Sequence, residues 1–286
     1  PENLRALVDG ALEDLRFSAA APTAGLEEAM RYSLLAGGKR IRPVLTLATA
    51  RAVGLEQRDV LPLAGAIELI HTYSLIHDDL PAMDDDELRR GQPTCHVKFG
   101  EDVAILAGDG LYAEAFRHLL GEQDGEPALV LAAARELAAA TGVDGMVGGQ
   151  YLDVAGVGET PEELRRLHAL KTGRLIGASV VCVLLLAGMD ETETTPWRRF
   201  AAELGVLFQI VDDILDVTGT DAALGKPTGS DERMGKRTYV SHFGVDGARD
   251  LARECHESAR ASLREAAPTG ATELEQITDF ILTRTA

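Results

Sequence analysis

The residues of this sequence most able to do chemistry are two clusters of aspartate. The first lies in IHDDLPAMDDDELRRG, which runs from Ile76 to Gly91 and holds six carboxylates between Asp78 and Glu87. An acidic run of this kind usually forms a solvated surface. Here a proline interrupts the run and two arginines follow it at once, so its interpretation depends on what else the chain contains.

The second cluster, FQIVDDILD, favours a metal site. It places Gln209, Asp212, Asp213 and Asp216 three and four residues apart, so that they share one face of a helix whose other positions are apolar. Carboxylates on such a helix need a partner because an unpaired buried charge is costly. A hard cation is the favoured partner, since Mg²⁺ is typically held by one or two carboxylates together with water and substrate phosphate.

Pro81 has a geometric role in the first cluster. Asp78 continues a helical stripe that begins at His71, whereas Asp84 lies six residues later, about 120° away around a straight helix. Proline disfavours α geometry in the residue before it and removes a backbone donor. We therefore predict that the chain turns at Pro81 and brings Asp84 back towards Asp78. The alternative is a simple helix end with no site attached.

The elements that must position these clusters are predicted to be helices. Ala, Leu, Glu and Arg dominate the chain, and period-two alternation of β-branched residues is nearly absent. TPEEL predicts a helix start at Thr160, with Glu163 closing a capping box, and TPW predicts another at Thr195. We find no linker or repeat and expect one all-α domain over residues 1–286. The glycine-rich stretch 218–236 is expected to be a loop and a candidate lid.

Charge and composition exclude several classes of protein. The formal net charge of −18, from 28 basic and 46 acidic side chains, argues against a nucleic-acid partner, since phosphate backbones need clustered Lys and Arg. Three widely spaced cysteines suggest neither a disulfide framework nor a zinc site and fit a cytoplasmic location. The most apolar run, 175–189, is shorter than the roughly 18 residues of a bilayer span, so we expect a buried helix and no stable membrane insertion.

Four motifs carry a family resemblance when they are taken in order: GGKRIRP, DDLPAMD, RRGQPTCH and DDILD. Together they resemble the trans-isoprenyl diphosphate synthases, and most closely the bacterial farnesyl diphosphate synthases, over about residues 34–239. The resemblance implies a single-domain, mostly antiparallel helical bundle around a deep apolar cavity, working as a homodimer. It also implies that the two aspartate motifs face each other across the mouth of that cavity.

The resemblance assigns roles residue by residue. The positions that resemble ligands of three Mg²⁺ ions, or their supporting members, are Asp78, Asp79, Asp84, Asp212 and Asp216. The positions that resemble an allylic diphosphate site are Arg89, Lys171, Thr172, Gln209, Lys226 and Lys236. The positions that resemble an isopentenyl diphosphate site are Gly38, Lys39, Arg42, His71 and Arg90. GGQYLD, with Gln150 and Asp153, also fits the family, but without a chemical role beyond close helix packing at its glycines.

The implied reaction is a head-to-tail condensation of isopentenyl diphosphate with an allylic diphosphate, dimethylallyl or geranyl. Breaking the allylic carbon–oxygen bond develops negative charge on the departing diphosphate, so metal ions and fixed cations placed there favour the transition state. A class I terpene cyclase and a non-catalytic synthase-like subunit are the rival hypotheses. A cyclase would not need a second diphosphate site, and a non-catalytic relative should have lost metal ligands, so the first hypothesis is favoured.

The length of the product is predicted from the residues that precede Asp78. If Asp78 anchors the diphosphate, the growing tail runs back along the preceding helix, where Tyr73 lies about 7.5 Å away along the axis, beside the smaller Ser74. An aromatic there, with the two-residue insertion of the first motif, resembles the farnesyl pattern. We expect farnesyl diphosphate as the main product and geranylgeranyl diphosphate as the alternative. A packing role for Tyr73 is the competing interpretation.

Overall fold

The structure is a computed structural model that describes residues 2–18, 21–219 and 236–284. Its α-helices are α1 (Glu2–Asp14), α2 (Ala24–Leu34), α3 (Ile41–Ala52), α4 (Leu61–Asp78), α5 (Cys95–Phe99), α6 (Glu101–Glu122), α7 (Pro127–Thr141), α8 (Met146–Val154), α9 (Pro161–His168), α10 (Arg174–Leu186), α11 (Glu191–Thr218), α14 (Tyr239–Ala266) and α15 (Thr272–Thr283). Shorter elements are the 3₁₀ turns η1 (Ala21–Thr23) and η2 (Gln57–Val60), the π-helical turn η3 (Ala169–Gly173), and the strands β1 (Leu88–Arg89) and β2 (Gln92–Pro93). The chain is therefore helical, as its composition predicts.

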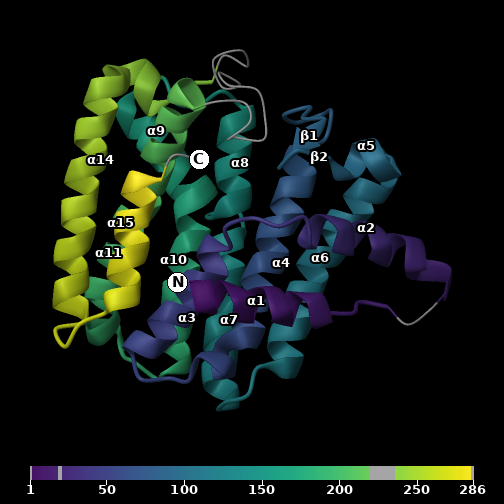
Figure 1. Cartoon of the computed structure of the whole chain (residues 1–286), viewed down its shortest axis with the longest axis horizontal. Coiled ribbons are helices and arrows are strands. Elements are labelled where there is room, and N and C mark those ends of the chain that lie inside the picture. The colour runs from purple at the N-terminus through teal and green to yellow at the C-terminus, as the bar shows by residue number, and fades with distance from the viewer. Residues whose placement is uncertain (1, 19–20, 220–235, 285–286) are drawn as a thin grey trace.

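The helices are arranged as a bundle with its long members roughly side by side (Figure 1). Helices α11, α14 and α15 form one side, α4 and α6 lie towards the other, and α10 packs between α3, α7 and α11. The α1–α2 pair crosses the front of the bundle, and the small β1–β2 hairpin stands above the end of α4. This arrangement brings the ends of α4, α8 and α11 to the same end of the molecule.

The core is one cluster of buried apolar side chains that extends from α1 to α15. Helix α10 contributes a nearly unbroken run of buried residues, which confirms the prediction that the most apolar stretch is a buried helix. Two helical runs, 57–78 and 161–186, are long and apolar enough to cross a membrane by composition, but 67% and 56% of their most apolar windows are buried inside the bundle. Packing inside the bundle accounts for their hydropathy.

The helix starts follow their capping signals, with one correction. Thr160 caps α9 and forms the predicted capping box with Glu163. The start predicted at Thr195 is wrong, because α11 already begins at Glu191 and contains Pro196 in its second turn. A second capping box, between Asp190 and Glu193, satisfies backbone donors at the true start and outweighs the Thr-Pro signal.

Candidate active site

A cavity of about 630 Å³ opens between α4, α8, α11 and the β1–β2 hairpin. Its walls carry side chains from both aspartate clusters and from several of the predicted cationic positions. The described lining includes Arg42, His71, Tyr73, Ser74, Asp78, Arg89, Arg90, Met146, Val147, Gln150, Lys171, Thr172, Phe208 and Asp212. The cavity is therefore lined both by charged side chains and by apolar and aromatic ones.

The first aspartate cluster turns as predicted. Helix α4 ends at Asp78, and the backbone N–H of Asp84 then donates to the carbonyl oxygen of Asp78 over 2.9 Å. Pro81 lies inside this turn, where no helical donor is needed. The proline thus returns the chain on itself and brings Asp84 beside the end of α4.

Two carboxylates of this first cluster are held by cations, and Asp78 carries a raised pKa. The guanidinium of Arg89 donates to both oxygens of the buried Asp79, at 2.8 and 2.9 Å from Nε. The ammonium of Lys236 lies 2.9 Å from Asp84. Burial raises the pKa of Asp78 to about 6; Lys171 opposes that rise, and the negative charge of Asp84 adds to it. Asp78 is therefore a carboxylate that a nearby cation would stabilise.

The aspartates of the second cluster lie in different environments, one in the cavity wall and the others buried. Asp212 lines the main cavity and accepts a hydrogen bond from Arg284. The neighbouring Asp213 is buried, accepts from the amide of Gln209 over 2.9 Å and accepts from the first backbone N–H of α14 over 2.7 Å. Asp216 is buried one turn after Asp212. The sequence places Asp212 and Asp213 together on one face, whereas the structure gives Asp213 a helix-capping role.

The donor set of the two clusters fits Mg²⁺. Asp78 and Asp212 line the same cavity, Asp84 lies beside the end of α4, and all three offer only oxygen ligands, which hard cations prefer. Within the described residues no three acidic, histidine or cysteine side chains form a closed metal cage. Mg²⁺ usually keeps several waters and takes further oxygens from substrate phosphates.

A two-residue hairpin separates the adjacent arginines. Leu88 pairs with Pro93 and Arg89 with Gln92, and the turn residues Arg90 and Gly91 have φ of 54° and 74°, as in primed hairpin turns. The hairpin was not predicted from the sequence. It turns Arg89 towards Asp79 and Arg90 towards the loop after α2.

Gly38 makes room for Arg90. The guanidinium of Arg90 donates to the carbonyl oxygen of Gly37, and a Cβ on Gly38 would lie only 2.6 Å from the guanidinium carbon. The φ of Gly38, +122°, is also one that other residues rarely adopt. The GGKRIRP and RRGQPTCH motifs therefore meet, as the predicted isopentenyl diphosphate site requires.

A basic and aromatic cluster adjoins this contact. A ring nitrogen of His71 lies 3.4 Å from Nη1 of Arg42. Burial lowers the pKa of His71 well below its ordinary value, and the positive charges of Arg42 and Arg90 lower it further, so the ring is neutral. Phe208 presents its ring to two guanidiniums, with Arg284 at 4.1 Å and Arg42 at 5.8 Å from its centre. These groups form an electropositive wall.

Two other basic residues of GGKRIRP lie outside the main cavity. Lys39 lines a neighbouring groove between α1, α3 and α15, where its ammonium lies 5.8 Å from the centre of the Phe280 ring. Arg40 is buried and bonds to Glu68 and Asp9 at 2.6 and 3.0 Å. Of the three basic side chains, Arg42 is the one that the structure places in the cavity wall.

Three of the predicted allylic diphosphate positions, Lys171, Gln209 and Lys236, line a second cavity of about 550 Å³, whereas Arg89 and Thr172 line the first, and Lys171 lines both. Thr172 donates to Gln209 over 3.1 Å, so these two predicted residues are in contact. Lys171 lies in the π-helical turn η3, an irregularity that is frequent at functional sites. Lys236 lines the second cavity, whereas Lys226 lies outside the described residues.

Tyr73 lines the cavity, and aromatic rings pack behind it edge to face. Tyr73 is 8% exposed and meets the rings of Tyr112 and His77 edge to face, at 5.1 and 5.5 Å between centres. Burial raises the pKa of Tyr73 to about 12. Phe116 lies behind Tyr112 at 5.3 Å. Ser74 lines the same cavity and donates to the carbonyl oxygen of His71.

Sequence reasoning missed two contributors to this site and named a third, Asp153, without a chemical role. Arg284 and Phe208 complete the basic and aromatic cluster, and Asp153 forms ion pairs with Lys171 and Lys236. A basic residue just after a C-terminal apolar helix was the available signal for Arg284. Gln150 lines the main cavity, and its buried amide has no hydrogen-bond partner among the described residues.

Comparisons with known proteins agree on one family. The polyprenyl synthetase family profile matches residues 23–276. A farnesyl diphosphate synthase of Geobacillus stearothermophilus is 49% identical over 253 residues, which cover 87% of this chain and 85% of that protein. A chloroplastic geranylgeranyl pyrophosphate synthase of Capsicum annuum is 45% identical over 91% of this chain and 71% of its own. The crystal structure of a Helicobacter pylori geranyltransferase complexed with magnesium and isoprenyl diphosphate superposes with a TM-score of 0.87, at 33% identity, over 98% of this chain and 94% of that one.

Proposed function

This chain belongs to the polyprenyl synthetase family, and we propose that it is a prenyltransferase that condenses isopentenyl diphosphate with an allylic diphosphate to give farnesyl diphosphate. The family match and the 49% identity to a farnesyl diphosphate synthase support this activity. The geranylgeranyl pyrophosphate synthase relative supports the longer product as the second candidate. The single observation that carries the proposal is the meeting of Asp78, Asp212, Lys171 and the arginine hairpin around one cavity with apolar and aromatic side chains in its wall.

In this proposal the acidic residues hold Mg²⁺, and the basic residues hold phosphate. Asp78, Asp84 and Asp212 would be the metal ligands, with Asp79 and Asp216 as supporting members, for three ions per site. When bound, the metal neutralises negative charge on the departing diphosphate. The presence of magnesium in the Helicobacter pylori structure supports the choice of ion.

The cations of the site divide between two diphosphates. Arg89, Lys171 and Lys236 would hold the allylic diphosphate, with Thr172 and Gln209 beside them, and so stabilise the charge that develops as its carbon–oxygen bond breaks. Gly38, Arg42, His71 and Arg90 would hold isopentenyl diphosphate, with Lys39 acting from the adjacent groove. Holding both substrates in one cavity replaces an encounter in solution by an oriented contact. The proton lost at the end would pass to the released diphosphate, so no side chain need act as base.

The apolar wall has two roles in the proposed reaction. It excludes water, which would otherwise quench the allylic cation. It also limits the length of the tail, since Tyr73 closes the space behind Asp78 with Tyr112 and Phe116 packed behind it. This supports farnesyl diphosphate as the main product.

We also propose a homodimer in the cytoplasm. Helix α6 carries large apolar side chains at the surface, Ile105, Leu106 and Leu120, which supports an interface with a second copy. The three cysteines are buried free thiols, which fits a reducing compartment. Light scattering of the purified protein would test the dimer.

A single assay tests the activity. Purified protein is incubated with Mg²⁺, labelled isopentenyl diphosphate and each allylic diphosphate in turn, and the products are separated by chromatography. We expect farnesyl diphosphate from dimethylallyl and geranyl primers. A cyclised hydrocarbon made from the allylic substrate alone would favour a terpene cyclase, and no turnover with any primer would favour a non-catalytic subunit.

A further inference from the structure

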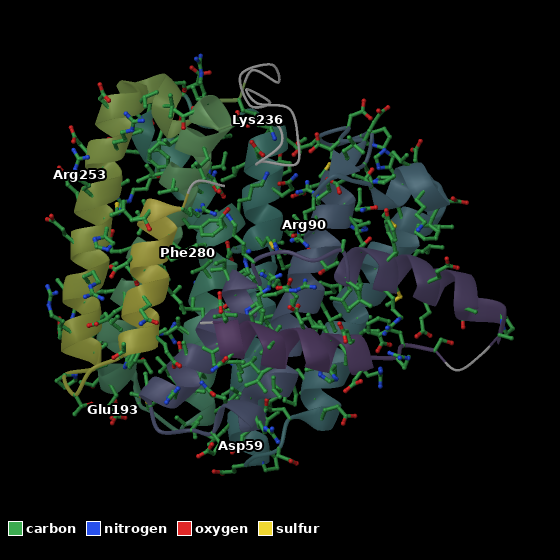
Figure 2. The ribbon with its side chains drawn as sticks, viewed as in Figure 1. Asp59, Arg90, Glu193, Lys236, Arg253 and Phe280 are labelled. Carbon is green, nitrogen blue, oxygen red and sulfur yellow. The ribbon has the colours of Figure 1, made fainter. Side chains whose placement is uncertain are left out.

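Asp153 on α8 connects two lysines that the proposed function places at the allylic diphosphate. Its Oδ2 lies 2.6 Å from Nζ of Lys171 and 3.6 Å from Nζ of Lys236. Lys236 in turn lies 2.9 Å from Oδ1 of Asp84. Figure 2 shows Lys236 at the end of the bundle where α8 ends, farther out than Arg90. Lys236 is therefore seated between a proposed metal ligand and a carboxylate that has no proposed metal role.

The fold holds Asp153 in this place. Gly149, one turn earlier on α8, packs directly on η3, where a Cβ would collide with the backbone of Lys171. Burial alone would raise the pKa of Asp153, but the charges of Lys171 and Lys236 outweigh it, and the pKa of Asp153 lies below its ordinary value. The side chain is only 16% exposed. Asp153 is thus an ionised and mostly buried counterion to both lysines.

We propose that Asp153 is a positioning residue that receives Lys236 when Mg²⁺ takes Asp84. This inference rests on the proposed function, because it assigns Asp84 to the metal. An ammonium removed from its carboxylate in a partly buried site is destabilised unless another partner lies close by. Asp153 is already 3.6 Å from the ammonium, so a small movement exchanges one carboxylate for the other. Asp84 is released to the metal while Lys236 stays where the diphosphate binds.

The exchange predicts a coupling between Asp153 and Lys236 in metal affinity. Asp153→Asn removes the carboxylate that receives the ammonium, so Lys236 competes more strongly with the metal for Asp84. In Lys236→Met no ammonium competes with the metal for Asp84, so replacing Asp153 should have little effect on metal affinity. The two substitutions should therefore be non-additive, as expected for residues that act through one contact.

The test is a double-mutant cycle on metal binding, which does not depend on turnover. The affinity of the substrate-free protein for Mn²⁺, used as a probe for Mg²⁺, is measured by electron paramagnetic resonance. We expect Asp153→Asn to raise the Kd about tenfold when Lys236 is present and less than about threefold in the Lys236→Met background. Asp153→Glu, which keeps a carboxylate in reach, should restore most of the affinity. Equal effects in both backgrounds, or none in either, would overturn the proposal.

Two controls test whether the change in Kd is specific to Asp153. Glu159→Gln removes one negative charge from the rim of the same cavity, where Glu159 is 71% exposed and pairs with Arg237, and it should leave the Kd unchanged. Thermal midpoints of all variants show whether the fold is intact. Wild-type turnover is measured separately: an inactive wild-type protein contradicts the proposed function, whereas an active protein with an additive cycle contradicts only the role of Asp153.

Discussion

The guanidinium of Arg284 donates to the carboxylate of Asp212 over 2.6 Å, which places the last described residue of the chain on the second aspartate motif. The same guanidinium donates to the carbonyl oxygen of Phe208 over 3.0 Å and stacks on its ring. Helix α15, which packs against α3, α11 and α14, positions this arginine. Arg284 therefore competes with any metal for Asp212.

Replacing Arg284 by Gln should tighten the binding of Mg²⁺ to the substrate-free protein. The pair is partly buried and worth about 1 kcal/mol, so we expect an affinity about fivefold higher once Asp212 is released. Isothermal titration with Mg²⁺ measures this directly. Arg260→Gln, which removes an arginine that pairs with α15 away from the cavity, is the matched control. Unchanged Mg²⁺ affinity in Arg284→Gln would contradict the competition.

Alanine at Asp78, Asp84 or Asp212 should lower turnover roughly a hundredfold or more and leave the protein folded. Each substitution removes a proposed metal ligand and no part of the apolar core. Steady-state kcat and the thermal midpoint are measured together. Asp109→Ala, on α6 and 64% exposed, serves as the control. Near-native turnover of Asp212→Ala would rule out a metal site built from both motifs.

Substitutions of the basic residues should raise the KM of one substrate more than that of the other. Arg42→Ala should chiefly raise the KM for isopentenyl diphosphate, by about tenfold or more, and Arg89→Ala should chiefly raise that for the allylic substrate. Lys39→Ala should have a smaller effect on the isopentenyl KM, because Lys39 lines the neighbouring groove. Kinetics with one substrate varied at a time decide this. Equal effects of Arg42→Ala on both substrates would argue against two separate sites.

Tyr73→Ala should lengthen the product. Removing the ring opens the space in front of Tyr112, so we expect geranylgeranyl diphosphate to replace part of the farnesyl product. The product distribution of mutant and wild type is compared under matched Mg²⁺ and substrate. Tyr73→Phe keeps the ring and should keep the wild-type distribution. If Tyr73→Ala makes the same products as wild type, the ring is a packing residue only.

The free energy of unfolding should decrease as the pH is lowered, because His168 is buried. This ring is 9% exposed, stacks on Tyr239, and has no hydrogen-bond partner among the described residues. Burial lowers the pKa of His168 to about 4; Asp153 opposes this, and Lys171 and Lys236 add to it. Between about pH 6.5 and 4 the unfolded chain then binds a proton that the folded chain does not, so stability is lost as the pH falls.

The pH effect of His168 amounts to roughly 3 kcal/mol once the pH is below 4. Denaturant unfolding between pH 7 and 4.5, without metal, measures the slope. His168→Gln removes the titrating group and should make the dependence of unfolding free energy on pH less steep. Identical slopes for wild type and His168→Gln would contradict the prediction.

Much of the fold was predictable because its signals are local. The three-to-four spacing of apolar residues, the capping box at Thr160 and the proline after Asp78 each act within a few residues of the chain. The start of α11 was misplaced because two local signals competed, and the stronger one lay earlier in the chain. The arginine hairpin was missed because two-residue strands leave almost no periodicity to detect.

The sequence by itself determined the helical class, the turn that returns Asp84 to Asp78 and the inventory of acids and bases, since these depend on residue type and near neighbours. Only the tertiary structure decided which of them meet. It placed Asp212 against Arg284, Asp213 under the start of α14 and Lys236 between Asp84 and Asp153. Such pairs join residues up to 152 positions apart in the chain. Helix packing brings them together, and spacing along a single helix cannot encode which side chain of another helix will lie opposite.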